Sequence, residues 1–169
     1  MVSREKKKPV ISLLSFLLLM SIQSVASAQL SRMDKVNNLY SCIKEYDIEC
    51  PREVLAIAIY ETGWMECHHC SYQFNNLFGF RAGREYLKFG SIYDCLQYLH
   101  DWQVAFYDPW KLKHPKGTYY EYLIHVRYAR SSMSNYILTI KSIERLVAKN
   151  TAAIDSLPLT YPSVELEGK

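Results

Sequence analysis

The apolar run at residues 54–61 constrains the fold of this chain most strongly, because it ends in a carboxylate. Its Val, Ile, Ala and Glu at positions 54, 57, 58 and 61 share one helical face, since positions three and four apart lie on the same side. The spacing predicts a core helix over residues 51–61. Pro51 suits the first turn of that helix, and Gly63 is well placed to end it.

Glu61 is the one charged residue on that face. An ionised carboxylate among apolar side chains is costly unless it is paired, so we expect burial to raise its pKa. A carboxylic acid that stays protonated in a cleft can act as a general acid. The alternative is a glutamate at a helix end that turns into solvent or pairs with an arginine.

The first 28 residues are typical of an export signal. A basic segment at Lys6–Lys8 precedes an apolar core over 10–22, which is too short for a comfortable membrane span. Small residues at 26–28 predict cleavage between Ala28 and Gln29. We therefore expect a periplasmic or secreted protein with no stable membrane insertion after cleavage. A retained N-terminal anchor is the alternative.

The charge balance argues against nucleic acid as a partner. The whole chain has 20 Lys and Arg residues against 17 Asp and Glu residues. The expected signal removes Arg4, Lys6, Lys7 and Lys8 together with Glu5, which leaves 16 of each. The basic character thus belongs to the export signal and is not a nucleic-acid footprint. The remaining chain has room for one core, and we expect a monomer.

All five cysteines follow the expected cleavage point: Cys42, Cys50, Cys67, Cys70 and Cys95. Disulfides can form in an exported protein, but an odd count leaves at least one thiol unpaired, and the sequence does not define the pairing. The Cys67–Cys70 segment would need further ligands to hold zinc, and a preceding strand to resemble a thioredoxin motif. We favour a structural disulfide or plain thiols there, and we expect no metal and no cofactor.

Helical periodicity dominates the rest of a domain that we expect to cover residues 29–149. Apolar residues recur at helical spacing in four further segments: 33–47, 92–106, 118–127 and 134–148. Ser91 and Asp94 resemble a capping box at the start of the second segment, and Asp108-Pro109-Trp110 should end it.

One small hairpin interrupts this helical pattern. Short apolar runs at 77–80 and 86–89 predict its strands, with residues 81–85 as the turn. Residues 65–76 are expected to form a polar loop, and residues 150–169 a disordered tail. The expected fold class is therefore α+β and mostly helical.

Three motifs give the chain a resemblance to a known family. Glu61-Thr62-Gly63-Trp64 is similar to a Glu-Ser-Gly-Trp motif at the end of an apolar helix, and residues 75–80 are similar to an Asn-Asn-Leu-Phe-Gly signature downstream. Tyr128-Ala129, followed by Tyr136, is similar to a Tyr-Ala…Tyr segment. In the order and spacing of these motifs over 36–147, the chain resembles the glucosaminidase-type peptidoglycan hydrolases of glycoside hydrolase family 73.

The resemblance implies a lysozyme-like fold with the small β-hairpin beside the catalytic helix. It also implies cleavage of the β-1,4 bond after N-acetylglucosamine in the glycan strands of peptidoglycan. The residues that match the family's catalytic positions are Glu61 as the general acid, Glu85 as a second acidic residue, and Tyr128 as a tyrosine at the catalytic centre.

The resemblance also implies that Asn75 and Asn76 shape a loop or bind substrate. Phe78 and Trp64 are further candidates for substrate binding. Trp64 can instead pack beneath the helix end, and the chain continues Trp-Met-Glu where the family continues Gly-Trp-Gly. This departure concerns the substrate subsites more than catalysis.

Glu85 and Tyr128 have alternatives as well. Glu85 beside Arg84 suits a charge that flanks a turn, and Tyr128 suits a packed position on a helix. For the whole protein, the alternatives are a non-catalytic glycan-binding protein that keeps the fold, and a muramidase on the same fold.

Overall fold

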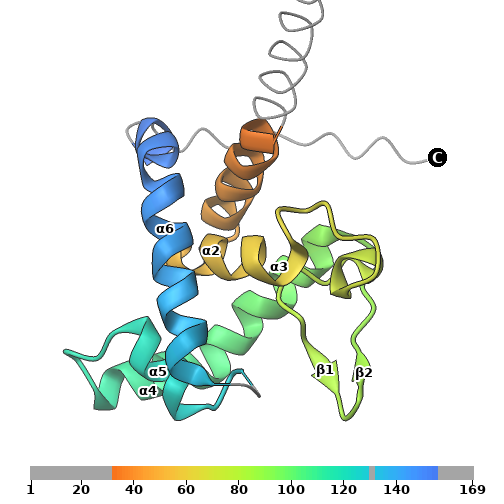
Figure 1. Ribbon diagram of the computed structural model, residues 1–169. Helices are drawn as coiled ribbons and strands as arrows, with labels where there is room; N and C mark the ends of the chain where they lie inside the picture. The colour runs from red at the N-terminus through yellow and green to blue at the C-terminus, as the bar shows by residue number, and fades with distance from the viewer. Residues whose placement is uncertain (1–31, 130–131, 156–169) are drawn as a thin grey trace, which may run out of the picture. The chain divides into compact units, whose positions relative to one another are not determined.

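The structure, a computed structural model, describes residues 32–129 and 132–155 (Figure 1). The chain divides into two units at residue 34, and only the second is described over most of its length. The signal peptide predicted for residues 1–28 lies outside the described residues. None of the helices in the described part is long and apolar enough to cross a membrane.

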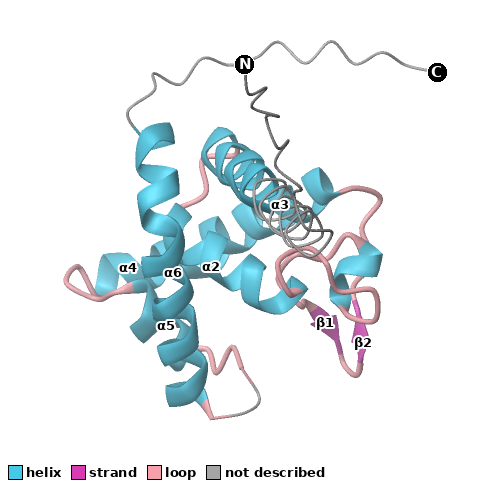
Figure 2. Ribbon diagram, turned by 45° about the horizontal axis from the view of Figure 1, so that its top comes forward, coloured by secondary structure: helices cyan, strands magenta, loops and turns pink. Residues whose placement is uncertain are grey.

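The described part is mostly helical, with one small antiparallel sheet (Figure 2). A helix over residues 32–45 comes first. The elements after it are α2 (Pro51–Thr62), the 3-10 turn η1 (Ser71–Phe74), β1 (Arg81–Ala82), β2 (Glu85–Tyr86), α3 (Ile92–Trp102), the π-helical segment η2 (Gln103–Tyr107), α4 (Asp108–Lys113), α5 (Tyr119–His125) and α6 (Met133–Asp155). The mostly helical α+β class predicted from the sequence is confirmed.

Helix α2 lies in the core. Every residue from Val54 to Ile59 is buried, so apolar side chains surround this helix on all sides. Pro51 occupies its first turn, and Gly63 ends it at a φ of +54°. Helix α6 packs against α2 and crosses it in Figure 1. The predicted core helix is confirmed, and its buried surface is wider than the single predicted face.

Helix α3 begins as the sequence predicted. The Ser91 hydroxyl accepts a hydrogen bond from the Asp94 amide at 3.2 Å, and the Asp94 carboxylate accepts one from the Ser91 amide at 2.9 Å. These two bonds confirm the capping box, which satisfies amides that the first helical turn leaves without partners.

The helix then runs further than predicted, because Pro109 does not end it. In η2 the Asp108 amide donates to the Gln103 carbonyl, which is the wider spacing of a π-turn. Pro109 has no N–H to donate and therefore fits the first turn of α4, directly after that π-turn. The prediction that residues 108–110 break the helix is wrong.

A hairpin is confirmed, but the predicted strand bounds 77–80 and 86–89 are wrong, because the strands are shorter and lie nearer the turn. β1 and β2 pair antiparallel on either side of the two residues Gly83-Arg84. Gly83 has a φ of +63°, which glycine adopts without strain. Residues 81–85, which the sequence placed in the turn, therefore contain most of the paired residues.

Two asparagines hold the base of this hairpin. The buried Asn76 amide donates to the carbonyls of Phe80 and Leu87 at 2.8 and 3.0 Å, and its oxygen accepts from the Phe80 amide at 3.0 Å. Asn75 donates to the Phe89 carbonyl at 3.0 Å. These bonds satisfy backbone groups that flank the short strands, so the two side chains fix where the hairpin leaves the core.

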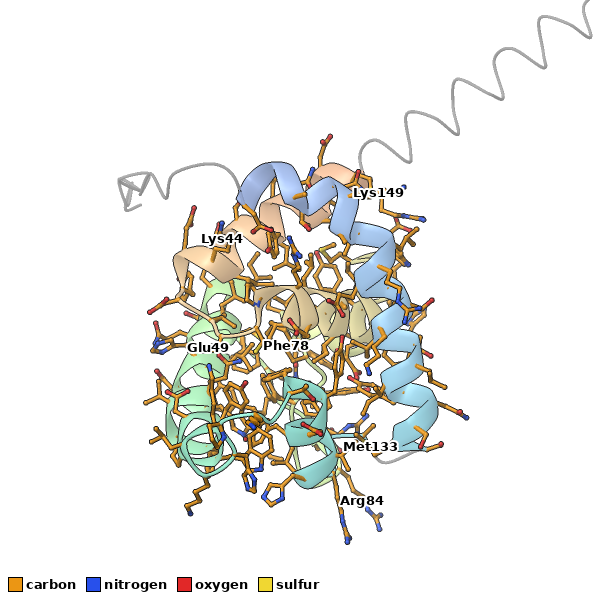
Figure 3. The ribbon with its side chains drawn as sticks, turned by 90° about the vertical axis from the view of Figure 1, so that its left-hand side faces the viewer. Lys44, Glu49, Phe78, Arg84, Met133 and Lys149 are labelled. Carbon is orange, nitrogen blue, oxygen red and sulfur yellow. The ribbon has the colours of Figure 1, made fainter. Side chains whose placement is uncertain are left out.

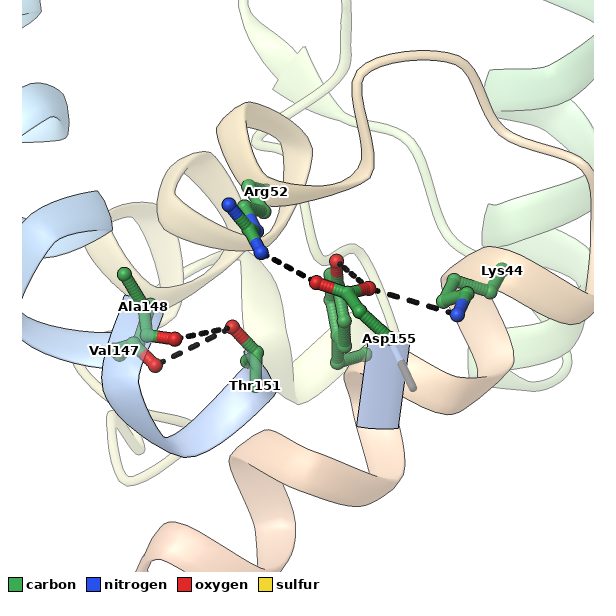
Figure 4. A network of polar contacts seen from close by, with 7 residues as sticks. Lys44, Arg52, Val147, Ala148, Thr151 and Asp155 are labelled. Atoms are coloured by element: carbon green, nitrogen blue, oxygen red, sulfur yellow. Dashed lines mark hydrogen bonds and ion pairs between the residues drawn. The ribbon is translucent and has the colours of Figure 1, made fainter. Parts of the chain in front are cut away.

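Helix α6 extends into the segment that the sequence predicted as a tail. Its last residue, Asp155, accepts a hydrogen bond from the Tyr40 hydroxyl at 2.8 Å and forms ion pairs with Arg52 and Lys44 (Figure 4). Thr151 is fully buried one turn earlier. The predicted tail boundary at residue 150 is wrong because these contacts stabilise the last turns of the helix. Residues 156–169 of that prediction lie outside the described residues.

We expect Asn76→Ala to lower the free energy of unfolding by about 2–4 kcal/mol, because it leaves buried backbone groups at Phe80 and Leu87 without partners. Urea unfolding followed by circular dichroism measures the change. Asn75→Gly is the control, because Asn75 has a φ of +54°, which glycine adopts without strain. It removes an amide from a less buried site, so we expect a loss of about 1 kcal/mol. Equal losses in the two variants would contradict the role given to Asn76.

Candidate functional site

A cleft of about 750 Å³ opens at the C-terminal end of α2. The hairpin, the α3–η2 helix, α5 and α6 contribute the rest of its walls. Aromatic rings dominate the lining: Tyr60, Phe78, Phe80, Tyr86, Trp102, Phe106, Tyr122, Tyr128 and Tyr136. A concave site lined by aromatic rings and a few polar groups is typical of ligand binding.

Glu61 supplies the single carboxylate among the described residues that line this cleft. The Tyr136 hydroxyl on α6 donates a hydrogen bond to Glu61 Oε1 at 3.0 Å. The second oxygen, Oε2, faces Gly79, and a Cβ built on that glycine would stand 2.8 Å from it. Gly79 also has a φ of +66°, so both the backbone conformation and the nearby carboxylate favour glycine here.

Burial raises the pKa of the Glu61 carboxyl above its usual range. The hydrogen bond from Tyr136 and the positive charge of Arg81 lower the pKa, but burial outweighs them. The carboxyl group therefore keeps its proton to a higher pH than an exposed glutamate does. This agrees with the expectation from the sequence, and it leaves no support for a glutamate that simply turns into solvent.

Tyr128 lines the cleft beside Tyr136, and their ring centroids are 6.0 Å apart. The Tyr128 hydroxyl donates to the Phe78 carbonyl at 2.6 Å. It therefore holds the chain at the residue before Gly79. Burial raises the pKa of Tyr128 well above its usual value, so the phenol remains a donor. Its direct part in catalysis stays a prediction.

Tyr136 is a site residue that sequence reasoning did not select. It is buried on α6 and reaches Glu61 only because α6 packs against α2. Burial raises the pKa of Tyr136 far above its usual value, which keeps its hydroxyl a donor to the carboxyl group. The signal in the sequence was its place in the Tyr-Ala…Tyr segment.

Glu85 lies outside the cleft lining. Glu85 is exposed on β2. The next residue, Tyr86, pairs with Arg81 on β1, and both of these line the cleft. Successive residues of a strand point to opposite faces, so Glu85 points away from the face that Arg81 and Tyr86 present. The described structure therefore does not bring Glu85 and Glu61 together in one cleft. The role of Glu85 as a second catalytic residue stays a prediction.

Of the four residues predicted to bind substrate, only Phe78 lines the cleft. It is 2% exposed and lies among the central side chains, whereas Arg84 projects outward at the hairpin turn (Figure 3). Asn75 and Asn76 bond to the hairpin backbone, which agrees with the alternative that they shape a loop. Trp64 is half-buried after the end of α2 and is not part of the lining.

The cleft also contains groups that the sequence did not single out. Arg81 and Arg127 bring two guanidinium groups to its lining. Trp102 and Phe106 come from α3 and η2, with ring centroids 6.1 Å apart, and Phe106 is 58% exposed. Phe106 lies within the π-helical segment, which local periodicity does not predict.

The cysteines do not form a recognisable reactive centre. All five are free thiols, and the Cys70 thiol donates to the Cys67 carbonyl at 3.6 Å. Within the residues that the structure describes, no group of three or more His, Cys, Asp or Glu side chains could hold a metal ion.

No family model, no curated protein and no solved structure matches this chain. The likeness to glycoside hydrolase family 73 therefore remains a resemblance in three motifs. The chemistry that the described residues offer is that of the cleft itself and of the carboxyl group at its wall.

We expect Gly79→Ala to lower the free energy of unfolding by about 2–4 kcal/mol. Its Cβ would stand 2.8 Å from Glu61 Oε2, and the positive φ adds backbone strain. Gly83→Ala is the matched control, because Gly83 has a φ of +63° but nothing within 4 Å of a new Cβ. It should lose only about 1–2 kcal/mol. Thermal unfolding measures both variants, and equal losses would show that the contact with Glu61 is unimportant.

We expect Glu61→Gln to stabilise the protein at pH 8 but not at pH 4. The pKa of Glu61 is raised in the folded state, so its contribution to stability is present in acid and is lost as the pH rises through that pKa. Glutamine stays neutral and still accepts a bond from Tyr136. Melting temperatures at both pH values measure the difference. The exposed change Glu85→Gln is the control, and a pH-independent effect of Glu61→Gln would contradict the raised pKa.

Proposed function

We propose that this protein is an exported peptidoglycan hydrolase, an endo-β-N-acetylglucosaminidase with a lysozyme-like fold. The observation that carries the proposal is the half-buried Glu61 carboxyl, with a raised pKa, at the wall of an aromatic cleft. Glycoside hydrolysis commonly needs such a protonated carboxyl at the leaving oxygen. The three motifs support the substrate class, and the export signal expected in residues 1–28 supports action in the periplasm or outside the cell.

In the proposed reaction, Glu61 donates its proton to the glycosidic oxygen while the bond from that oxygen to C1 breaks. Water then adds to C1 and releases a proton. Tyr136 donates to Oε1, which leaves Oε2 to carry the proton that is transferred. Gly79 has no side chain to cover Oε2, so this oxygen can meet the substrate from the cleft.

The second half of the reaction has two routes. A movement of the hairpin that turns Glu85 toward the substrate would let it activate water, and the anomeric centre would be inverted. In the other route the acetamido oxygen of the substrate attacks C1 as the leaving group departs, with no second carboxylate as the nucleophile. Water then opens the resulting oxazolinium ring at C1, the Glu61 carboxylate takes up the proton of that water, and the configuration is retained. NMR of the first product distinguishes the two outcomes, and Glu85→Gln slows only the first route.

A second candidate is a glycan-binding protein that keeps the cleft without turnover. The observation in its favour is that Glu61 is the single carboxylate among the described lining residues. The aromatic walls would serve binding equally well in either case. Assays of hydrolysis and of binding therefore have to be made on the same preparation.

We expect the mature domain to release new N-acetylglucosamine reducing ends from purified peptidoglycan. Glu61→Gln should lower the rate by about 10²–10⁴-fold, because the general acid is lost. Reduction with borohydride followed by sugar analysis identifies the ends, and a melting curve shows that the variant is folded.

Other results of this experiment would favour a different function or contradict the role of Glu61. New N-acetylmuramic acid ends would indicate a muramidase on the same fold. Binding without new ends would favour the glycan-binding candidate. Equal rates for the wild type and Glu61→Gln would contradict the role proposed for Glu61.

A further inference from the structure

Arg127 lines the cleft with a guanidinium group that has no partner within residues 32–129 and 132–155. It is exposed and directly follows the C-cap of α5. The other cleft arginine, Arg81, is already engaged. It donates to the Arg84 carbonyl at 2.7 Å and lies over the Tyr86 ring at 3.8 Å from the ring centroid. Arg127 is therefore the cationic group that is available to a ligand.

The backbone at Arg127 is the kind that usually carries glycine. Its φ is +52°, and the Tyr128 amide bonds back to the Leu123 carbonyl at 3.0 Å, which is the usual closure of a helix at a left-handed residue. A long charged side chain gains nothing from this conformation. An arginine here is strained, and its guanidinium group makes no contact in the described structure that would offset this strain.

The surroundings of Arg127 match a sugar with a negative charge. Trp102 and Phe106 line the cleft with it, with ring centroids 6.1 Å apart, and offer apolar faces to a pyranose ring, since Phe106 is exposed and Trp102 half-buried. The described lining holds two guanidinium groups and one carboxylate, Glu61, so its charge is positive even with Glu61 ionised. A planar guanidinium binds a carboxylate through two parallel hydrogen bonds.

We propose that Arg127 is a specificity residue that binds a carboxylate group of the glycan substrate beside the aromatic wall. The inference rests on the proposed function, since it takes the ligand to be a cell-wall glycan. Two sources can supply this carboxylate: the lactyl ether of a muramic acid without peptide, and the peptide that is attached to it in intact strands. A neutral chitin oligomer supplies neither.

Binding is measured with Glu61→Gln as the background, so that the glycan stays intact. The probes are peptide-free glycan strands, strands that carry peptides, and a neutral oligomer of N-acetylglucosamine. The test variants are Arg127→Gly, which removes the charge at a position suited to glycine, and Arg127→Lys, which keeps it. Arg84→Gln is the control, because Arg84 is exposed outside the cleft lining.

We expect Arg127→Gly to weaken binding of one or both acidic probes by about three- to tenfold at low salt and to leave the neutral oligomer unchanged. The loss should shrink at high salt, and Arg127→Lys should recover part of it. Which acidic probe responds identifies the source of the carboxylate. The melting temperature of Arg127→Gly should equal or exceed that of its parent, so misfolding would not explain the loss.

Failure of this inference is distinct from failure of the proposed function. Equal weakening for all three probes, or no weakening for any, would overturn the role of Arg127 even if the wild type hydrolyses peptidoglycan. Selective weakening with a wild type that releases no reducing ends would keep the carboxylate site and overturn only the enzymatic proposal.

Discussion

The half-buried carboxyl group of Glu61 is partly removed from water, and separate parts of the chain are arranged around that group. α6 provides the Tyr136 hydroxyl for one oxygen, and the segment before β1 provides Gly79 beside the other. Without the hydrogen bond the buried carboxyl would have a still higher free energy, and with any side chain at position 79 it could not stay where it is. The position of α6 and the path of the chain at Gly79 are therefore linked through a single side chain.

The path of the chain at Gly79 is itself fixed from both sides. Tyr128 binds the carbonyl of the residue before this glycine, and Asn76 binds the amide of the residue after it. The side chains of Tyr128 and Asn76 both lie outside the strands. The hairpin therefore does not depend only on the hydrogen bonds between its two short strands. This explains how strands of two residues each can carry one wall of a cleft.

The parts of the fold that could be predicted from the sequence are those with local causes. The core helix, the Ser91 capping box and the hairpin follow from periodicity, caps and glycine. The π-turn before Pro109 and the last turns of α6 could not be predicted, because the first depends on packing and the second on contacts of Asp155 with Tyr40 and Arg52. Within the site, the raised pKa of Glu61 followed from its helical face. The direction in which Glu85 points could not be predicted from the sequence, since it depends on the register of the hairpin.

Helix α6 also sets the order in which the cleft can be completed. It follows every other lining segment along the chain, and it carries Tyr136 near its start and Asp155 at its end, roughly 30 Å apart. During synthesis, Glu61 is therefore made well before its phenolic partner, Tyr136. Only after α6 docks on α2 does the carboxyl group reach its final environment. A chain halted before that point has the acidic residue and the hairpin, but it lacks the finished cleft.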